Sequence, residues 1–253
     1  NKDKIHAFFY APKNRKVCGH SSESPPAIFL CHGGPTSSAK NNLNFKIQFW
    51  TNRGFAVIDL NYRGSSGFGR HYREKLYGKW GEYDIQDIQA AAEYFSHQQM
   101  IDKDRCIIRG SSAGGYTVLS ALTKLTLFKT GACIYGIGDL QKLATDTHKF
   151  ESKYLDTLIG DTLNQQETYQ QRSPINHIDD IDCPVIFLQG LKDKVVPPSQ
   201  SKSMVDKLIQ KNIAVEYVTF KDEGHGFKKP KNIEAALTRE LLFYLNVLSL
   251  NQQ

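Results

Sequence analysis

The sequence has no long apolar run and no recognisable leader. None of its hydrophobic stretches approaches the roughly 20 residues that a membrane-spanning helix needs, so we expect no membrane partner. Residues 1–4 are polar and do not resemble a signal peptide, which predicts a cytoplasmic location. The first residue is not methionine, so we expect either a fragment or a processed form.

Cysteine is scarce and irregularly spaced. No Cys-x-x-Cys pair occurs, so we expect no metal site and no redox site. Most of the cysteines lie in or beside apolar segments, where thiols are usually buried and free, which favours a reducing compartment. The five are Cys18, Cys31, Cys106, Cys133 and Cys183.

The chain also lacks a strong charge excess. Its 32 basic and 26 acidic residues give a net charge of +6, spread along the chain and densest at residues 13–16 and 228–231. No zinc-finger, RNA-binding or basic-helix signature accompanies the charge. We therefore interpret it as solvated surface and expect no nucleic-acid partner.

What the sequence does contain is an alternation of strand-like and helix-like segments. Several of the strand-like runs are almost wholly apolar, as strands buried on both faces should be. This alternation predicts an α/β fold with a mostly parallel sheet covered by helices on both faces, within a single domain over residues 1–253. The predicted strands are Ile5–Tyr10, Ala27–Cys31, Phe55–Leu60, Cys106–Ile108, Ala132–Ile137, Val185–Leu188 and Val215–Phe220.

Apolar stripes with helical spacing lie between these runs and after them. One stripe joins Ile85 to Phe95, a second joins Met204 to Ile209, and a third belongs to a closing helix that begins near Pro230. The stretch from residue 140 to residue 174 is polar, interrupted and longer than a plain crossover helix. It predicts a helical cap near the functional site rather than a second domain.

The segment Gly110-Ser111-Ser112-Ala113-Gly114-Gly115 carries the strongest chemical signal. It follows a predicted strand and precedes the helix-like stretch Tyr116–Leu125. A G-x-S-x-G in that context is typical of a nucleophile elbow, in which a serine sits on a sharp, strained turn. The flanking glycines have no Cβ to collide with the strand and helix. Ser112 is therefore the candidate nucleophile, and a Gly/Ser turn without chemistry is the alternative.

A serine hydroxyl needs a base, and the base needs an acid that fixes its tautomer. In α/β-hydrolases the acid and then the base follow the serine along the chain. Of the eight histidines only His225 follows the last predicted strand, so it is the candidate base, with an exposed loop histidine as the alternative. Asp193 follows the carboxyl end of a buried strand and is the candidate acid. The rival acid is Asp139, which we expect instead to cap the helix starting at Leu140.

An oxyanion hole needs two backbone N–H groups. One should belong to the residue after the nucleophile, Ala113, and the other to a glycine-rich loop after an early strand. The loop His32-Gly33-Gly34-Pro35 is the candidate, because glycine lets the backbone approach a substrate oxygen closely. An ordinary tight turn is the alternative.

Together these motifs resemble the catalytic domain of the prolyl oligopeptidase family of serine peptidases, and in particular its acylaminoacyl-peptidase and dipeptidyl-peptidase branches. The resemblance runs from about Ile5 to Leu248. The Asn-Tyr-Arg-Gly-Ser segment at 61–65 and the double glycine after the elbow distinguish it from generic esterases. The motifs are His32-Gly33-Gly34-Pro35, Asn61–Gly69, Trp80-Gly81 with Asp84 and Asp87, Gly110–Gly115, Ser173-Pro174, Gln189–Pro197 and Gly224-His225-Gly226-Phe227.

The resemblance implies an α/β-hydrolase fold with Ser112 as nucleophile, His225 as general base and acid, and Asp193 as its orienter. It also implies an oxyanion hole at the N–H groups of Gly34 and Ala113, and hydrolysis of short peptides through an acyl-enzyme without a cofactor. A carboxylesterase with the same three side chains is one alternative. A non-catalytic binding or dimerisation domain that keeps the fold is another.

The chain departs from the family pattern near the site. Where some members use a tyrosine hydroxyl as oxyanion donor this chain has His32, so the donor should be a backbone N–H, with Tyr62 and Arg63 bracing the loop. Ala113 stands where many members carry a large tyrosine. Val195 stands where many carry a polar residue that can hold a substrate carbonyl. This difference leaves open whether the protein cleaves at a fixed distance from the peptide end, as an exopeptidase does.

The resemblance also suggests a specificity pocket and further parts of the protein. The side chain before the cut bond would contact Ile137, Leu140, Leu143 and Val195, although these four suit the core equally well. Typical members carry an N-terminal β-propeller that filters substrates by size, and this sequence contains none. We expect that a propeller could lie outside this chain, and that the protein could form a homo-oligomer.

Overall fold

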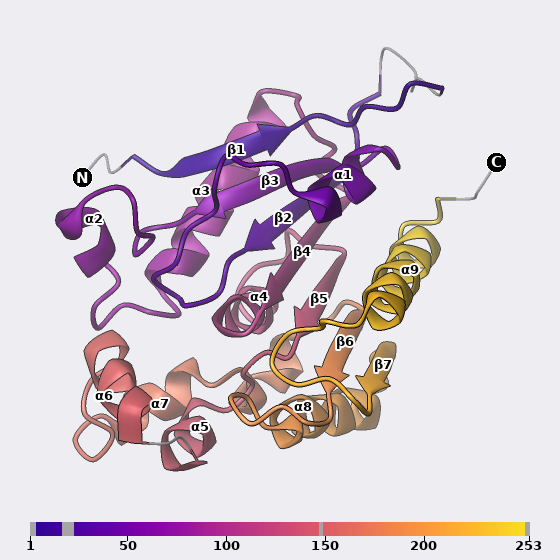
Figure 1. Ribbon diagram of the computed structural model, residues 1–253. Helices are drawn as coiled ribbons and strands as arrows, with labels where there is room; N and C mark the ends of the chain where they lie inside the picture. The colour runs from indigo at the N-terminus through magenta and orange to yellow at the C-terminus, as the bar shows by residue number, and fades with distance from the viewer. Residues whose placement is uncertain (1–3, 17–22, 147–148, 251–253) are drawn as a thin grey trace.

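The structure is a computed structural model that describes residues 4–16, 23–146 and 149–250 (Figure 1). Within these ranges seven strands form one sheet in the order β1-β3-β2-β4-β5-β6-β7. β1 runs antiparallel to β3, and every other neighbouring pair is parallel. The predicted sheet is thereby confirmed. The strands are β1 (His6–Tyr10), β2 (Ala27–Cys31), β3 (Ala56–Asn61), β4 (Cys106–Ser111), β5 (Thr130–Ile134), β6 (Val185–Gly190) and β7 (Val215–Phe220).

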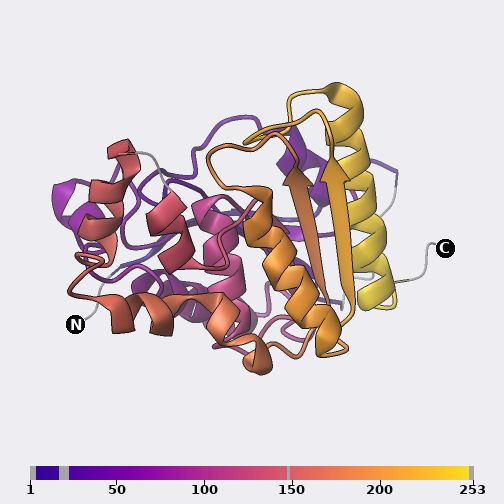
Figure 2. The ribbon, with the colours of Figure 1, turned by 90° about the horizontal axis from the view of Figure 1, so that it is seen from below.

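Helices cover both faces of the sheet, as predicted. Figures 1 and 2 show α9 packed along one face beside β6 and β7, with α8 on the other. No described helix is long and apolar enough to cross a bilayer. The helices are α1 (Phe45–Thr51), α2 (Arg70–Glu74), α3 (Tyr83–His97), α4 (Ala113–Leu122), α5 (Leu140–Asp146), α6 (Lys149–Leu158), α7 (Gln166–Arg172), α8 (Pro198–Gln210) and α9 (Pro230–Val247), with short 3₁₀ turns at Pro174–Asn176 and Ile178–Asp180.

Two apolar cores sandwich the sheet, because successive strand residues point to opposite faces. In β2, Phe29 joins the core under α3, α4 and α8, whereas Ile28 joins the core under α1 and α9. In β6, Phe187 and Ile186 divide in the same way. Burial on both faces explains why these strands are nearly continuous apolar runs in the sequence.

Several strand boundaries differ from the prediction by one to three residues, and the ends of β4 and β5 differ most. β4 continues through Ser111, because residues 109–111 pair with β5 instead of forming the turn that their Arg-Gly-Ser composition indicates. β5 ends at Ile134 rather than at residue 137, because Tyr135 adopts a left-handed conformation with φ of 38° that breaks the ladder. The helix after the elbow accordingly starts at Ala113, three residues earlier than predicted.

The stretch between β5 and β6 contains α5, α6 and α7, in agreement with the predicted helical segment. These helices gather on the side of the molecule beside α2 and α8 (Figure 1). Arg172 at the end of α7 donates hydrogen bonds to the carbonyl oxygens of Gly78 and Trp80, each at 3.1 Å. Tyr116 of α4 donates to the carbonyl oxygen of Arg172 at 3.0 Å. The helical segment is thus tied directly to the helix that follows the elbow.

Asp59 on β3 provides a test of the buried sheet. Burial raises the pKa of its carboxyl from 3.8 to about 6. The folded protein therefore binds this proton more tightly than the unfolded chain, so stability falls as the pH rises from about 4 to about 6. We expect Asp59→Asn to raise the free energy of unfolding at pH 7.5 by about 2 kcal/mol.

Urea unfolding of both proteins at pH 4 and at pH 7.5 measures this effect. The gain should be much smaller at pH 4, where Asp59 is protonated in the folded protein and partly protonated in the unfolded chain. The exposed carboxyl of Asp104 supplies the control, since Asp104→Asn should change little at either pH. An equal gain at both pH values would show that the burial of the charge is not its cause.

Candidate active site

Ser112 lies at the junction of β4 and α4. Its backbone has φ of 57° and ψ of −124°, a conformation that costs a non-glycine residue on the order of 1–3 kcal/mol. The turn is held from both sides. The N–H of Ser112 donates to the carbonyl oxygen of Ile134 at 3.0 Å, and its carbonyl oxygen accepts from Tyr116 at 3.1 Å. The sequence prediction of a strained elbow agrees with this geometry.

The glycines of the elbow are required by close packing of backbones. A Cβ on Gly114 would overlap the carbonyl oxygen of Cys31 at the end of β2, and one on Gly110 would overlap the carbonyl oxygen of Gly114. A Cβ on Gly115 would lie 2.7 Å from the Cα of Gly136. α4 can therefore sit directly against three strand ends only because these positions carry no side chain.

Gly114→Ala is expected to destabilise the protein by about 3 kcal/mol, because neither backbone can move away from the new methyl group. Chemical denaturation measures the loss. Gly54→Ala is the control: its Cβ would meet nothing within 4 Å, so only its positive φ of 89° matters, at a cost of about 1 kcal/mol. Equal losses in the two variants would mean that α4 does not press on β2 as described.

His225 connects Ser112 with Asp193. Its Nε2 lies 2.9 Å from the Ser112 Oγ, and its Nδ1 lies 2.8 Å from the Asp193 Oδ2. The second carboxylate oxygen, Oδ1, accepts from the N–H groups of Val195 and Val196, each at 2.9 Å. Since the carboxylate can only accept, the imidazole donates from Nδ1 and leaves Nε2 free to accept the serine proton. The structure thus brings the three predicted side chains into one hydrogen-bonded line.

The loops that carry Asp193 and His225 are joined to each other. The N–H of Lys192 donates to the carbonyl oxygen of Glu223 at 2.8 Å, which links the two loops across the ends of β6 and β7. The buried carboxylate of Glu223 accepts from the N–H groups of Lys228 and Lys229 and thereby closes the loop around His225. Burial raises the pKa of Glu223, but these hydrogen bonds and one from Asn232 outweigh it and hold the pKa below its ordinary value.

Two N–H groups beside Ser112 are available to an oxyanion. Among the described residues neither the N–H of Gly34 nor that of Ala113 has an acceptor, and both residues border the same small cavity as Ser112. Ala113 is the first residue of α4, where backbone N–H groups have no partner within the helix. The macrodipole of α4 adds partial positive charge at the same point.

His32 has a structural role in the loop. Its ring stacks on Tyr62 at a centroid distance of 4.3 Å, with Nε2 at 2.7 Å from the Ser65 Oγ and Nδ1 at 2.9 Å from the carbonyl oxygen of Gly33. Burial lowers the pKa of His32 to about 4, against the hydrogen bond to the Gly33 carbonyl. The ring is therefore uncharged at neutral pH.

Tyr62 and Arg63 brace this loop, as expected. The Tyr62 hydroxyl reaches the carbonyl oxygens of His32 and Pro35, each at 3.0 Å. Arg63 donates from its backbone N–H and from Nε to the buried carboxylate of Asp87, at 2.6 and 2.8 Å. The glycines of the loop are thereby fixed next to Ser112.

An apolar cavity of about 80 Å³ opens beside Ser112, Gly34 and Ala113. Three of the four predicted pocket residues, Ile137, Leu143 and Val195, line it. Leu140 does not: it is fully buried in the core, and its N–H is held by the Ser173 Oγ at 3.0 Å. The other apolar lining residues are Pro35, Trp80, Tyr154, Leu155, Leu158 and Val196.

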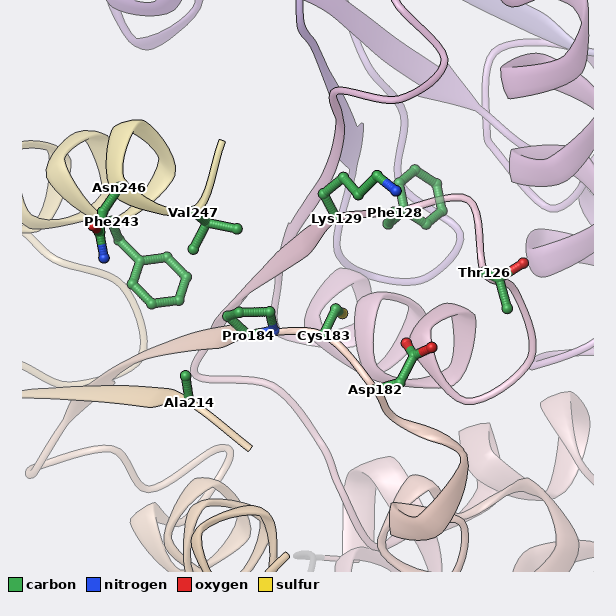
Figure 3. Close-up of a pocket in the computed structure, with 10 residues that line it drawn as sticks. All are labelled: Thr126, Phe128, Lys129, Asp182, Cys183, Pro184, Ala214, Phe243, Asn246 and Val247. Carbon is green, nitrogen blue, oxygen red and sulfur yellow. The ribbon is translucent and has the colours of Figure 1, made fainter. Parts of the chain in front are cut away.

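A larger hollow of about 480 Å³ lies elsewhere (Figure 3). Lys129, Pro184 and Ala214 at its border immediately precede β5, β6 and β7, whereas Ser112, Asp193 and His225 follow strand ends. In a parallel sheet, residues that precede the strands and residues that follow them lie at opposite ends of the strands, so this hollow is not at the end that carries Ser112, Asp193 and His225.

No group of described His, Cys, Asp and Glu residues could hold a metal ion, and the four described cysteines are free and buried. Cys18 lies outside the described residues.

Comparison with known proteins gives the family. The sequence profile of the prolyl oligopeptidase family matches residues 41–251. The chain belongs to this family. Its sheet order, its strained elbow serine and its two linked loops are therefore those of a member of a family of serine peptidases.

Solved structures and curated proteins of the prolyl oligopeptidase family agree with this assignment. A puromycin-hydrolyzing peptidase of Mycobacterium tuberculosis is 42% identical, with a TM-score of 0.96 over 98% of this chain and 38% of its own. Dipeptidyl aminopeptidase BIII of Pseudoxanthomonas mexicana is 32% identical over 86% of this chain and 32% of its own length. An acylamino-acid-releasing enzyme of Arabidopsis thaliana is 26% identical over 91% of this chain and 31% of its own. The chain thus spans about a third of these relatives.

Proposed function

We propose that the protein is a serine peptidase that hydrolyses peptide bonds of short peptides through an acyl-enzyme on Ser112. The observation that carries the proposal is the continuous line of hydrogen bonds from Asp193 through His225 to Ser112. Family membership supports the same chemistry. So do the relatives named for releasing dipeptides or acylated amino acids.

The proposed reaction has two halves. His225 Nε2 takes the hydroxyl proton of Ser112 while Oγ attacks the peptide carbonyl, and the resulting oxyanion receives hydrogen bonds from the N–H groups of Gly34 and Ala113. His225 then gives the proton to the leaving amine as the C–N bond breaks, which leaves an ester on Ser112. A water molecule repeats the sequence and releases the acid. Asp193 holds the imidazole orientation throughout.

The lining of the cavity beside Ser112 supports a proposal for the kind of residue that precedes the cut bond. Its lining is apolar, with Ile137, Leu143 and Leu158 among the contacts, so we propose a preference for an apolar residue at that position. The side chain of Val195 is 44% exposed at its border. It offers no polar group there to fix a substrate carbonyl, which favours broad acceptance of peptide lengths.

A substrate panel tests the proposal against the carboxylesterase alternative. We expect hydrolysis of peptidyl anilides with apolar residues before the anilide, and of puromycin, for which two similar solved structures are named. Short acyl esters should also react, because an ester is the easier substrate of the same machinery. Turnover of esters with no turnover of any amide would reject the peptidase and favour the esterase.

A further inference from the structure

A second small cavity, of about 60 Å³, lies behind Ser112 on the face of the sheet covered by α1 and α9. Lys46 of α1, Arg109 and Ser111 of β4, and Tyr135 after β5 provide its polar lining, and Phe227 of the histidine loop borders it. None of these side chains belongs to the proposed reaction. The volume is about twice the roughly 30 Å³ that a water molecule occupies in the liquid.

The charges around this cavity do not balance. Arg109 donates from Nε and Nη2 to the two carboxylate oxygens of Glu240, at 2.6 and 3.2 Å. Glu240 is fully buried and also accepts from the Tyr244 hydroxyl at 2.7 Å. Among the described residues Arg109 Nη1 and Lys46 Nζ have no acceptor. The carboxylate of Glu240 thus pairs with Arg109, and the exposed Lys46 has no carboxylate partner among the described residues.

The environment of the two cations shows that they influence each other. Burial lowers the pKa of Lys46, and the charge of Arg109 lowers it further, against the opposing effect of Glu240. Burial raises the pKa of Tyr135, while Ser111 and Arg109 act in the opposite direction. The charge of Arg109 thus lowers the pKa of both Lys46 and Tyr135. A negative ion among them would relieve the repulsion between the cations.

We propose that this cavity binds a small inorganic anion, held by Lys46 Nζ, Arg109 Nη1 and the hydroxyls of Ser111 and Tyr135. The two cations offer only donors and each hydroxyl can donate one hydrogen bond, which suits a halide or a tetrahedral oxyanion such as phosphate. The cavity size admits either ion. Two carboxylates oppose the anion: Glu240, whose two oxygens already accept from Arg109, and Asp193, whose charge acts on Tyr135.

The bound anion would stabilise the residues that support Ser112 and His225. Ser111 precedes the nucleophile directly, and the Tyr135 ring packs against the His225 ring at a centroid distance of 4.8 Å and against Phe227 at 5.4 Å. An ion that orders Ser111 and Tyr135 therefore orders the support of both Ser112 and His225. This coupling to turnover rests on the proposed function, whereas anion binding itself does not.

Binding is tested by ³⁵Cl and ³¹P line broadening on the purified protein, in gluconate buffers of constant ionic strength. We expect the protein to broaden the chloride signal, the phosphate signal, or both, and the broadening should saturate. If both signals broaden, the two ions should compete, and the ion that binds more tightly is thereby identified. Lys46→Gln should weaken binding about tenfold or more, because it removes the one cation at the cavity that has no carboxylate partner among the described residues. The exposed Lys103 is the control, and Lys103→Gln should bind as the unmodified protein does.

The same titration with a peptidyl anilide measures the coupling. We expect kcat to rise severalfold with the bound ion in the unmodified protein and in Lys103→Gln, but not in Lys46→Gln at the same ion concentration. Broadening that is absent, does not saturate, or is equal in Lys46→Gln overturns the anion site. Saturable binding with no turnover of any substrate overturns the proposed function instead and leaves the site in place.

Discussion

His225→Ala is expected to lower kcat for a peptidyl anilide by a factor on the order of 10⁴–10⁶, because removal of one member of a triad disables the whole unit. The imidazole is the only base in hydrogen-bond contact with Ser112 among the described residues. The other histidine near the loop, His32, is a poor substitute, because burial lowers its pKa to about 4 and its ring is held by Ser65 and Gly33. Steady-state kinetics with a chromogenic anilide measures the loss.

The exposed His97 at the end of α3 provides the matched control. His97→Ala should leave kcat within about twofold, since surface substitutions away from the site rarely matter. Circular dichroism should show both variants folded, because His225 lies at the sheet edge rather than in either core. A loss of less than about tenfold in His225→Ala would mean that another group is the base.

Asp193→Asn is expected to lower kcat by about 10⁴-fold, and the structure indicates why so conservative a change is costly. The N–H groups of Val195 and Val196 both need an acceptor, so the amide oxygen of the asparagine should turn toward them. Its NH₂ group then faces His225 Nδ1 and forces the imidazole into the tautomer protonated at Nε2. That tautomer cannot take the proton of Ser112.

The rival acid Asp139 is the matched control for this substitution. Its carboxylate accepts from the N–H of Lys142 at 2.9 Å and so caps α5, as predicted. Asparagine keeps that acceptor, and we expect Asp139→Asn to retain kcat within about twofold. A large loss in Asp139→Asn together with a small one in Asp193→Asn would exchange the two assignments.

The three candidate catalytic residues could be predicted because each follows the end of a predicted strand, and the strands before Ser112 and Asp193 begin as short apolar runs. Strands buried on both faces leave a strong sequence signal, and parallel strands present their carboxyl ends at one edge. Ser112, Asp193 and His225 can therefore be predicted from these local patterns together with the order serine, acid, histidine along the chain. The glycines around them strengthened the prediction, since their roles at tight turns depend on local geometry.

The specificity pocket could not be predicted in the same way. Trp80, Tyr154 and Leu158 reach it from segments whose position depends on how the helices between β5 and β6 pack on the sheet. Nothing in an apolar residue's local sequence separates a core position from a pocket wall. Leu140 illustrates this: it was predicted beside Leu143 in the pocket, but its place at the start of α5 turns it into the core.

The ends of β4 and β5 were predicted wrongly for a related reason. The composition of residues 109–111 indicates a turn, yet pairing with β5 holds them extended. Arg109 is tolerated there because Glu240, 131 residues later, meets its guanidinium. A partner so distant in sequence gives no local signal, and the cationic cavity beside it is equally invisible until the chain is folded.

The most direct test is labelling by a fluorophosphonate, followed by peptide mapping. A single ester of Ser112 is expected in the folded protein, no label in Ser112→Ala, and normal labelling in Ser96→Ala, a change at the end of α3. Ordinary serines do not react with this probe, so reaction at Ser112 requires the hydroxyl to be activated by His225. A folded protein that takes up no label, or takes it up at another residue, would contradict the proposed catalytic role of Ser112.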